Sequence, residues 1–210
     1  MAIQTAERSS HLDPSENVIF QRHMIAYNQA AKLISGTVLE IGCGEGYGME
    51  ELAKYSTRYI GVDKFDTNIP KSVIDNNDVV FHKMEIPPLN NIEANSIDFV
   101  VTFQVIEHIE DDNYFLKEIY RVLKPGGKLL LTTPNKLMSL SRNPWHIREY
   151  DPTEMKNIIR KFFHQFEIKG VFGNQVIMDY YNKNKESVER ITIFDIFNLQ
   201  YNLPRWILKI

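Results

Sequence analysis

The sequence predicts an α/β fold in which helices cover a mostly parallel sheet of short, buried strands. An apolar run ends at Ile41, and three alternating glycines follow it at Gly42, Gly44 and Gly46. Further short apolar runs come later in the chain, and segments with apolar residues at helical spacing separate several of them. Such runs are typical of strands that are buried on both faces, as in a parallel sheet.

The composition limits the classes of protein to be considered. The chain has 210 residues, which suits one domain of ordinary size with a small appendage. Its formal net charge of -3 provides no basic field, so nucleic acid is not an expected partner. Cys43 is the only cysteine, which excludes an intramolecular disulfide. No apolar run has the length of a signal-peptide core or of a membrane span, and we expect a cytoplasmic protein without a transmembrane segment.

The first helix has a clear start signal. Asp13 can cap the helix, Pro14 suits its first position, and Glu16 can complete a capping box. We expect the helix to run to about Ser35, with Gly36 as its C-terminal cap. Its apolar face, which is expected to pack on the sheet, consists of Phe20, His23, Met24, Tyr27, Ala31 and Ile34.

The glycine-rich loop after the first strand predicts a site for a small molecule. Glycine permits positive φ angles and close approach of the backbone to a ligand, and the N–H groups of the next helix, expected over 49–55, point to the same place. The second strand, expected over 59–63, ends in Asp63, 19 residues beyond Gly44. A carboxylate there can accept hydrogen bonds from both hydroxyl groups of an adenosine ribose. The alternative is a solvated loop aspartate.

The rest of the chain continues the alternation of strands and helices. The expected strands are residues 79–84, 96–103, 128–133 and 166–172. The expected helices run from Asp111 or Asp112 to the Pro125-Gly126-Gly127 segment, from Asp151 to about Phe163, and from Val188 to Leu199. The loop over 133–150 is long for a compact domain and carries Trp, His, Arg and Tyr, so we expect it to be functional.

Four motifs, in this order, resemble those of the class I S-adenosylmethionine-dependent methyltransferases. The first is Thr-Val-Leu-Glu-Ile-Gly-Cys-Gly-Glu-Gly-Tyr-Gly at 37–48, in which Tyr47 stands where a dinucleotide-binding loop has its third glycine. The second is the acid that ends the second strand. The third is the acid-histidine pair Glu107-His108 after the fourth strand. The fourth is Arg-Val-Leu-Lys-Pro-Gly-Gly-Lys-Leu at 121–129, which is typical of the small-molecule branch of this superfamily.

The resemblance covers roughly residues 37–172 and implies a Rossmann-like, doubly wound, mostly parallel sheet with helices on both faces. An N-terminal helical lid and a helical C-terminal appendage complete the expected architecture. Residues 1–36 are then the arm and lid helix, 37–173 the S-adenosylmethionine-binding core, and 174–210 an apolar appendage that is not an independent domain. If the first helix is a lid, Arg22 and Tyr27 are candidate substrate-side residues.

The cofactor implied by the resemblance is S-adenosyl-L-methionine, with S-adenosyl-L-homocysteine as the product. Met84 and Glu85 are expected at the adenine, where the family more often has an aspartate than a glutamate. Cys43 is not expected to act as a nucleophile, since no histidine is placed in the sequence to activate it. The residues expected to hold the cofactor are Glu40, Gly42, Cys43, Gly44, Gly46, Asp63, Met84, Glu85, Phe103 and Gln104.

The expected reaction is transfer of a methyl group to a small-molecule acceptor. An oxygen, in a hydroxyl or carboxyl group of a metabolite, lipid-linked or glycan-like substrate, is favoured because the fourth strand lacks the Asn/Asp-Pro-Pro-aromatic string of methyltransferases that act on exocyclic amines and on glutamine. One alternative is a non-catalytic module that binds S-adenosylmethionine. The other is a nicotinamide or nucleotide-sugar enzyme that shares the glycine loop.

Two histidines are the expected catalytic residues. An oxygen acceptor requires a base with a pKa near the working pH, and His108 and His146 are both expected at the cofactor edge of the sheet. We favour His146 as the base, and we expect His108 to support the helix start or the position of the substrate. Alternatively, His146 orders its loop through Glu149 or a backbone carbonyl. No metal is expected: relatives with a divalent-metal site carry Glu-x-x-Glu-His, and Gln104 replaces the first carboxylate here.

The last part of the chain is apolar, and its role stays open. Residues 201–210 end in Leu-Pro-Arg-Trp-Ile-Leu-Lys-Ile, which could pack as a lid, form a dimer contact, or contact a membrane surface through Trp206 with Arg205 and Lys209. The expected partner is the small-molecule acceptor. The chain is expected to be a monomer or a homodimer, and a peripheral contact of its C-terminal part with a membrane stays open.

Overall fold

The computed structural model describes residues 17–67, 69, 71–76, 78–192, 199 and 203. The chain divides into two compact units, Met1–Thr133 and Pro134–Ile210. This division differs from the expected boundaries at 36/37 and 173/174. Those boundaries separate parts of the chain by their expected function, whereas the two units are separated by their compactness, so the functional division stays a prediction. Among the described residues, no helix combines the length and the apolar character needed to cross a bilayer.

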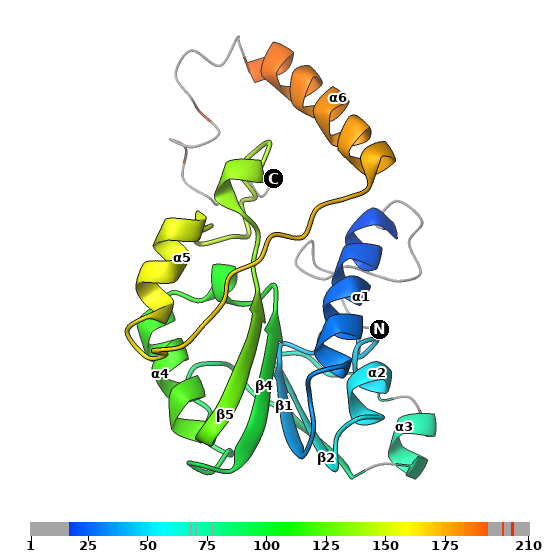
Figure 1. The fold of residues 1–210 in the computed structure, drawn as a ribbon, viewed down its shortest axis with the longest axis vertical. Helices are drawn as coiled ribbons and strands as arrows, with labels where there is room; N and C mark the ends of the chain where they lie inside the picture. Colours follow the sequence, from blue (N-terminus) through cyan, green and yellow to red (C-terminus); the bar gives the residue numbers. More distant parts are fainter. Residues whose placement is uncertain are drawn as a thin grey trace. The chain divides into compact units, whose positions relative to one another are not determined.

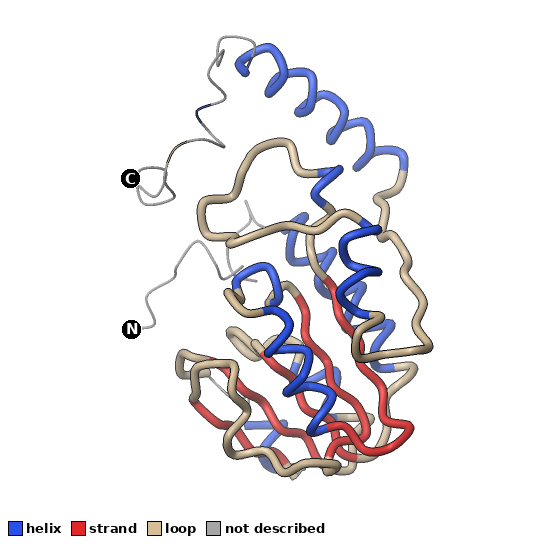
Figure 2. The backbone as a smooth tube through the Cα atoms, turned by 90° about the vertical axis from the view of Figure 1, so that its left-hand side faces the viewer, coloured by secondary structure: helices blue, strands red, loops and turns tan. Residues whose placement is uncertain are grey.

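The first unit is built on a five-stranded sheet in which every pair of neighbouring strands is parallel. Its strand order is β3-β2-β1-β4-β5. Figure 1 shows α1, α2 and α3 on one side of the sheet and α4 on the other, and in Figure 2 α4 lies in front of the strands. The strands are β1 (Thr37–Ile41), β2 (Arg58–Asp63), β3 (Val79–Lys83), β4 (Ile97–Phe103) and β5 (Leu123–Thr132). The helices are α1 (Asn17–Ala31), α2 (Met49–Ala53), α3 (Lys71–Asn76) and α4 (Asp112–Val122). The predicted α/β class and doubly wound, parallel sheet are confirmed.

The register of the sheet brings the ends of three strands together. Ile41 at the end of β1 is paired with Val62 of β2 on one side and with Thr102 of β4 on the other. Because the strands are parallel, the loops that leave them emerge at one edge of the sheet. The chain also reverses its direction of progress between β1 and β4, and such a reversal is where open α/β sheets bind ligands.

Most element predictions in the first unit are confirmed, with differences at several element ends. Helix α1 ends at Ala31 rather than at about Ser35, and β5 begins at Leu123 rather than at residue 128. The acid-histidine pair Glu107-His108 lies in a 3₁₀ turn, Ile106–His108, which was not predicted. The helix capped by Asp111 ends at Val122, before the predicted stop, because Leu123 is extended and pairs with Ile97 of β4. Helix α3 was not predicted. The start signal of the first helix, Asp13 to Glu16, lies outside the described residues.

The second unit is largely helical. It contains a 3₁₀ turn at Lys136–Met138, helix α5 (Pro152–Ile159) and helix α6 (Gln175–Thr192). The predicted start of α5 is confirmed, since Asp151 and Glu154 form a reciprocal capping box. The long loop is closed at its base by an isolated bridge between Asn135 and Tyr150.

Two predictions for the second unit are wrong. Residues 166–172 form no strand, since their alternating apolar pattern stabilises a strand only when a neighbour supplies hydrogen bonds, and the described residues provide none. The last helix begins at Gln175 rather than Val188, because the side chain of Asn174 accepts a hydrogen bond from the backbone N–H of Ile177 and so provides a helix cap. Arg205, Trp206 and Lys209, for which a membrane contact was considered, lie outside the described residues.

A clamp on α4 holds the loop that follows β3. Arg121 donates hydrogen bonds to the carbonyl oxygens of Leu89 and Ile92, both at 3.0 Å, and to the carboxylate of Glu118. Glu118 also accepts a hydrogen bond from the backbone N–H of Leu89 at 3.0 Å. The hydrogen bonds from Arg121 lower the pKa of Glu118 in spite of its burial. The Arg121 of the fourth sequence motif therefore has a structural role, which is to fasten the loop next to the site.

Replacing Arg121 with Met should lower the free energy of unfolding by about 1 to 3 kcal/mol, since two buried carbonyl groups lose a charged donor. Urea denaturation measures this loss, and Lys117→Met, an exposed cation on the same helix, is the control. Because the pKa of Glu118 is lowered in the folded state, the clamp contributes above the unfolded pKa, and the difference between wild type and variant should shrink as the pH falls through the folded pKa. Equal stability of both variants at neutral pH would contradict the clamp.

Candidate active site

The glycine loop wraps around an open space at the carboxyl edge of the sheet. Gly42, Gly44 and Gly46 all have positive φ angles, of 79°, 55° and 84°. A β-carbon on Gly44 would have no heavy atom within 4 Å, whereas one on Gly42 would lie 2.3 Å from a methyl group of Val105. The loop therefore needs glycine for its conformation, and at Gly44 it leaves its backbone open to a ligand.

Asp63, the last residue of β2, and Thr67, which follows that strand, both hold the loop at Gly44. Asp63 accepts hydrogen bonds from the backbone N–H groups of Gly44 at 2.8 Å and Phe65 at 2.9 Å. Thr67 donates its hydroxyl proton to the carbonyl oxygen of Gly44 at 2.8 Å. Sequence reasoning found Asp63 but missed Thr67, because no motif marks a threonine that acts only through the folded loop.

A cavity of about 280 Å³ opens at this edge within the first unit. It is formed by the glycine loop, by the carboxyl ends of β2 and β4, by the loop after β3 and by α1. Its lining residues are His23, Tyr27, Gly42, Cys43, Gly44, Glu45, Tyr47, Asp63, Lys64, Phe65, Glu85, Ile86, Phe103, Gln104, Val105, His108 and Ile109.

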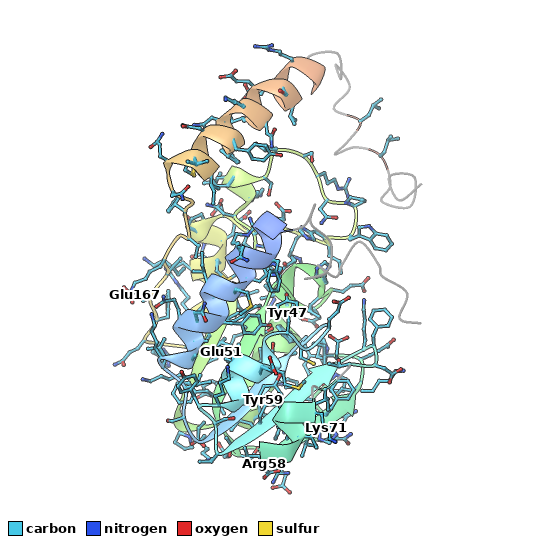
Figure 3. The ribbon with its side chains drawn as sticks, turned by 90° about the vertical axis from the view of Figure 1, so that its right-hand side faces the viewer. Tyr47, Glu51, Arg58, Tyr59, Lys71 and Glu167 are labelled. Atoms are coloured by element: carbon cyan, nitrogen blue, oxygen red, sulfur yellow. The ribbon has the colours of Figure 1, made fainter. Side chains whose placement is uncertain are left out.

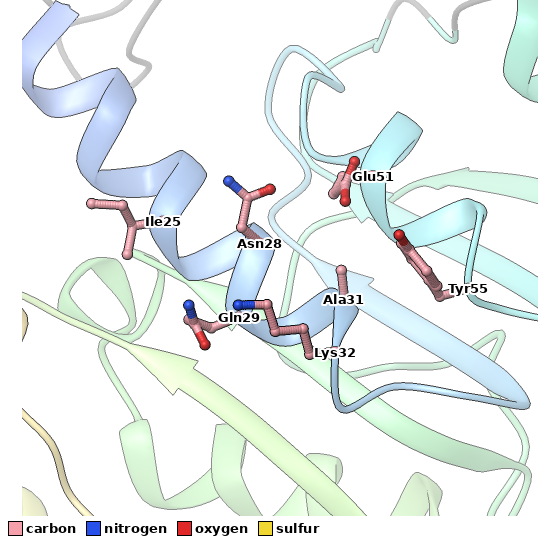
Figure 4. Close-up of a pocket in the computed structure, with 7 residues that line it drawn as sticks. All are labelled: Ile25, Asn28, Gln29, Ala31, Lys32, Glu51 and Tyr55. Atoms are coloured by element: carbon pink, nitrogen blue, oxygen red, sulfur yellow. The ribbon is translucent and has the colours of Figure 1, made fainter.

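A second cavity, of about 470 Å³, lies between α1 and α2 on the outside of the same unit (Figure 4). Its polar side chains include the exposed Asn28 and Gln29 of α1 and Glu51 of α2. It shares no lining residue with the cavity at the carboxyl edge and contains none of the predicted cofactor residues. The cavity at the carboxyl edge is therefore the candidate active site.

The structure brings most of the predicted site residues to this cavity. Of the ten residues expected to hold the cofactor, Glu40, Gly46 and Met84 are not among its lining. His108 lines the cavity. Glu107 does not line it; its side chain is buried and accepts a hydrogen bond from Thr133 at 3.0 Å.

At the end of the cavity where the adenine is expected, Glu85 and Ile86 line the cavity and Met84 does not. The backbone N–H of Met84 donates to the carbonyl oxygen of Asp63 at 2.9 Å, so this residue continues the pairing of β3 with β2. Phe65 and Ile86 provide the apolar surfaces at this end, and sequence reasoning missed both. The alternating pattern at the end of β3 did not indicate which of two neighbouring residues would face the ligand.

Gln104 has an unusual backbone conformation at the end of β4. Its φ angle is 56°, which a residue with a side chain adopts at an energetic cost. Two hydrogen bonds to Thr132 of β5 hold it there, one from the backbone N–H at 2.9 Å and one from the side-chain amide at 3.1 Å. The chain therefore turns sharply at Gln104, which brings this residue and Val105 to the cavity.

Cys43 lies in the loop as a free, buried thiol. Burial, together with the nearby Glu40, raises the pKa of this thiol well above its usual range. It therefore stays protonated at neutral pH, in agreement with the prediction that it does not act as a nucleophile.

Glu40 lies beneath the loop and is almost fully buried, with 1% of its surface exposed. Tyr27 of α1 donates to one carboxylate oxygen at 2.5 Å, and Tyr59 of β2 donates to the other. Burial raises the pKa of Glu40 to about 7, although the two hydroxyl groups oppose the rise. Direct contact of Glu40 with the cofactor stays a prediction, and in the structure its carboxylate contacts Tyr27 and Tyr59.

His146 belongs to the second unit, in a hydrogen-bonded group within the long loop. Its Nδ1 lies 2.6 Å from Glu149, and its Nε2 lies 3.0 Å from the side-chain nitrogen of Asn143. Ser139 donates a hydrogen bond to the other oxygen of Glu149. Burial would raise the pKa of Glu149, but these hydrogen bonds outweigh it and keep the carboxylate ionised. The contact with Glu149 that the alternative role of His146 requires is present, and the role of His146 as base stays a prediction.

Replacing Glu40 with Gln should remove a pH dependence of stability. The folded pKa of about 7 lies above the ordinary value of 4.5, so the stabilisation is complete below about pH 4.5 and is lost as the pH rises toward 7. The loss corresponds to roughly 3 kcal/mol in the wild type and should be nearly absent in the variant. Urea denaturation at about pH 5 and about pH 8 measures it, and equal pH dependence in both proteins would contradict the buried carboxyl.

Comparison with known proteins agrees with this site. The model of the methyltransferase domain family matches residues 19–175. A protein of Mycolicibacterium smegmatis, named a probable S-adenosylmethionine-dependent methyltransferase, is 36% identical over 177 residues, which are 80% of this chain and 67% of that protein. The human mitochondrial ubiquinone biosynthesis O-methyltransferase is 33% identical over 112 residues, which are 50% of this chain and 30% of that protein.

The chain spans 58% to 67% of the length of the mycobacterial relatives it matches. A Haloferax volcanii structure, a complex of the Trm112 methyltransferase activator with a methyltransferase, has a TM-score of 0.57 at 20% identity and covers 71% of this chain and 72% of that one. This likeness shows the fold. On the family model and the mycobacterial relative, the chain belongs to the S-adenosylmethionine-dependent methyltransferases, and S-adenosylmethionine is its cofactor.

Proposed function

We propose that the protein transfers the methyl group of S-adenosylmethionine to an oxygen, hydroxyl or carboxyl, of a small metabolite, lipid-linked or glycan-like acceptor. The observation that carries the proposal is the cavity at the carboxyl edge, which combines the open glycine loop, the carboxylate of Asp63 and the end of β4. Two features support an oxygen acceptor. The human relative is named an O-methyltransferase, and the end of β4 reads Phe-Gln-Val rather than Asn/Asp-Pro-Pro-aromatic.

The residues of the cavity fit the cofactor. The space in front of Gly44 leaves room for a ligand against the backbone. Each oxygen of Asp63 accepts a backbone hydrogen bond, and a carboxylate oxygen can accept more than one, so this side chain suits the hydroxyl groups of a ribose. Phe65 and Ile86 offer apolar contact to the adenine, and Gln104 with Phe103 lies where the methionine part is expected.

The bound cofactor supplies an electrophilic methyl group on a positively charged sulfur, so the protein needs little covalent chemistry of its own. The chain's residues hold the cofactor, orient the acceptor and exclude water. The aromatic rings of Tyr27, Tyr47 and Phe103 line the cavity and displace water from it. His108 lines the same cavity, and we propose that it positions the acceptor.

We propose His146 as the base that removes the acceptor's proton. With Nδ1–H donated to Glu149, the imidazole is held in the tautomer in which Nε2 is the basic nitrogen. In the structure Asn143 lies at this nitrogen, so the acceptor's hydroxyl group would replace the Asn143 contact. The cytoplasm is the proposed compartment, which suits the free thiol of Cys43.

Titration with S-adenosylhomocysteine tests the cofactor site. We expect binding by the wild-type chain, and a loss of affinity on the order of 100-fold for Asp63→Ala, since charged hydrogen bonds to the ribose are lost. The matched control is Asp66→Ala, which removes an exposed aspartate from the same loop. No binding by the folded wild type would favour the nicotinamide or nucleotide-sugar alternative, and full binding by Asp63→Ala would remove Asp63 from the site.

Turnover of His146→Ala tests the base. With an acceptor found by screening hydroxyl, carboxyl and amine compounds, we expect unchanged affinity for S-adenosylhomocysteine and a fall in turnover on the order of 100-fold or more. His164→Ala, an exposed histidine of the same unit, is the control. Undiminished turnover would exclude His146 as the base, and a protein that binds the cofactor but methylates nothing would favour the non-catalytic module.

Chelation separates two roles of His146. A base oriented by Glu149 needs no cation, so turnover should be unchanged after exhaustive treatment with EDTA. If turnover is lost and magnesium or manganese restores it, His146 is better explained as a metal ligand than as a base. Cofactor titration with the chelated protein serves as the control for folding.

A further inference from the structure

Helix α1 is fastened to the glycine loop by two side chains that lie one helical turn apart. Tyr27 donates its hydroxyl proton to Glu40 at 2.5 Å, and Nδ1 of His23 lies 2.9 Å from the hydroxyl oxygen of Tyr47. Burial, with help from Arg22, lowers the pKa of His23 to about 4, so this ring is neutral at physiological pH. Both α1 side chains also line the cofactor cavity.

The ring of Tyr27 occupies a space that the loop leaves for it. A β-carbon on Gly48 would lie 2.0 Å from an atom of this ring, although the φ angle of Gly48, -78°, would suit any residue. The ring is also edge-on to those of Tyr47, at 5.7 Å between centroids, and Phe103, at 5.0 Å. Tyr27 therefore packs between the loop and the end of β4, and its hydroxyl group reaches the carboxylate beneath.

Glu40 receives two tyrosine hydroxyl groups of different origin. Tyr59 lies in β2 and belongs to the rigid sheet, whereas Tyr27 comes from α1. Figure 3 shows Tyr59 in the sheet and Tyr47 beside α1. Because Glu40 precedes the first glycine of the loop by two residues, a hydrogen bond from Tyr27 connects α1 directly to the strand that carries the loop.

We propose that Tyr27 is a positioning residue for the cofactor: it couples the docking of α1 to the ligand-binding shape of the glycine loop through Glu40. The proposal rests on the proposed function, because it takes this cavity as the cofactor site. It replaces the expectation that Tyr27 faces the substrate. By linkage, a cofactor that favours the docked loop also stabilises α1, and a docked α1 raises the affinity for the cofactor by the same factor.

Tyr27→Phe and Tyr59→Phe form a matched pair, since each removes one hydroxyl group from the same carboxylate and keeps the ring. Titration with S-adenosylhomocysteine measures affinity, and amide hydrogen exchange with and without this ligand measures protection of α1. We expect Tyr27→Phe to weaken binding about 10-fold and to lose most of the ligand-induced protection of α1. Tyr59→Phe should change affinity by less than about 2-fold and keep that protection.

Gly48→Ala is a second variant that leaves both tyrosines and Glu40 intact. The added methyl group displaces the ring of Tyr27, so we expect the same loss of affinity and of α1 protection without removal of any hydrogen-bonding group. This variant decides the question if Tyr27→Phe does not fold.

Three outcomes would overturn the proposal: unchanged affinity in both Tyr27→Phe and Gly48→Ala, equal losses in the Tyr27→Phe and Tyr59→Phe variants, or ligand-induced protection of α1 that survives the loss of the Tyr27 hydroxyl group. Each of these outcomes requires a wild-type chain that binds S-adenosylhomocysteine. If the wild-type chain itself does not bind, the proposed function fails, and this result is distinct from the three.

Discussion

The first unit depends on a buried carboxylate with two tyrosine partners. Moving a carboxyl group such as that of Glu40 out of water is unfavourable, and its raised pKa expresses this cost. The hydroxyl groups of Tyr27 and Tyr59 offset part of the cost and, in doing so, connect α1, β1 and β2 at a single point. Because this point lies directly beneath the glycine loop, the polar contact that allows the fold to bury Glu40 also determines where the loop begins.

The candidate site follows from the parallel sheet. Asp63, Glu85 and Gln104 are far apart in the sequence, but each follows a strand whose carboxyl end lies at the same edge. Their hydrogen bonds then link neighbouring loops: Asp63 to the glycine loop, and Gln104 to the end of β5. On the other side of the sheet, the Arg121 clamp fastens the loop after β3. A cavity with polar ends and aromatic walls is the result, and it matches the chemistry of an adenosine-containing cofactor.

In the second unit, the hydrogen-bonded group around His146 depends on local contacts and not on the pairing of strands. His146, Glu149 and Asn143 lie within one short segment, so their contacts are local, and the sequence was sufficient to indicate the pairing of His146 with Glu149. Ser139 completes the group from the other end of the loop. Such a group fixes the tautomer of a histidine, which is a requirement for a base and equally a means of ordering a loop.

The sequence alone determined the features that depend on neighbouring residues: the glycine loop, the buried strands, the capping box at Asp151 and the position of Asp63 at a strand end. Tertiary structure decided which other residues belong to the site and which contacts they make, because these contacts join residues that are remote in the chain. It selected Thr67 and Ile86 for the site and put Tyr27 against Glu40. It also left residues 166–172 without a neighbouring strand in the part of the chain that the structure describes, and a strand is stabilised by hydrogen bonds that only another segment can supply.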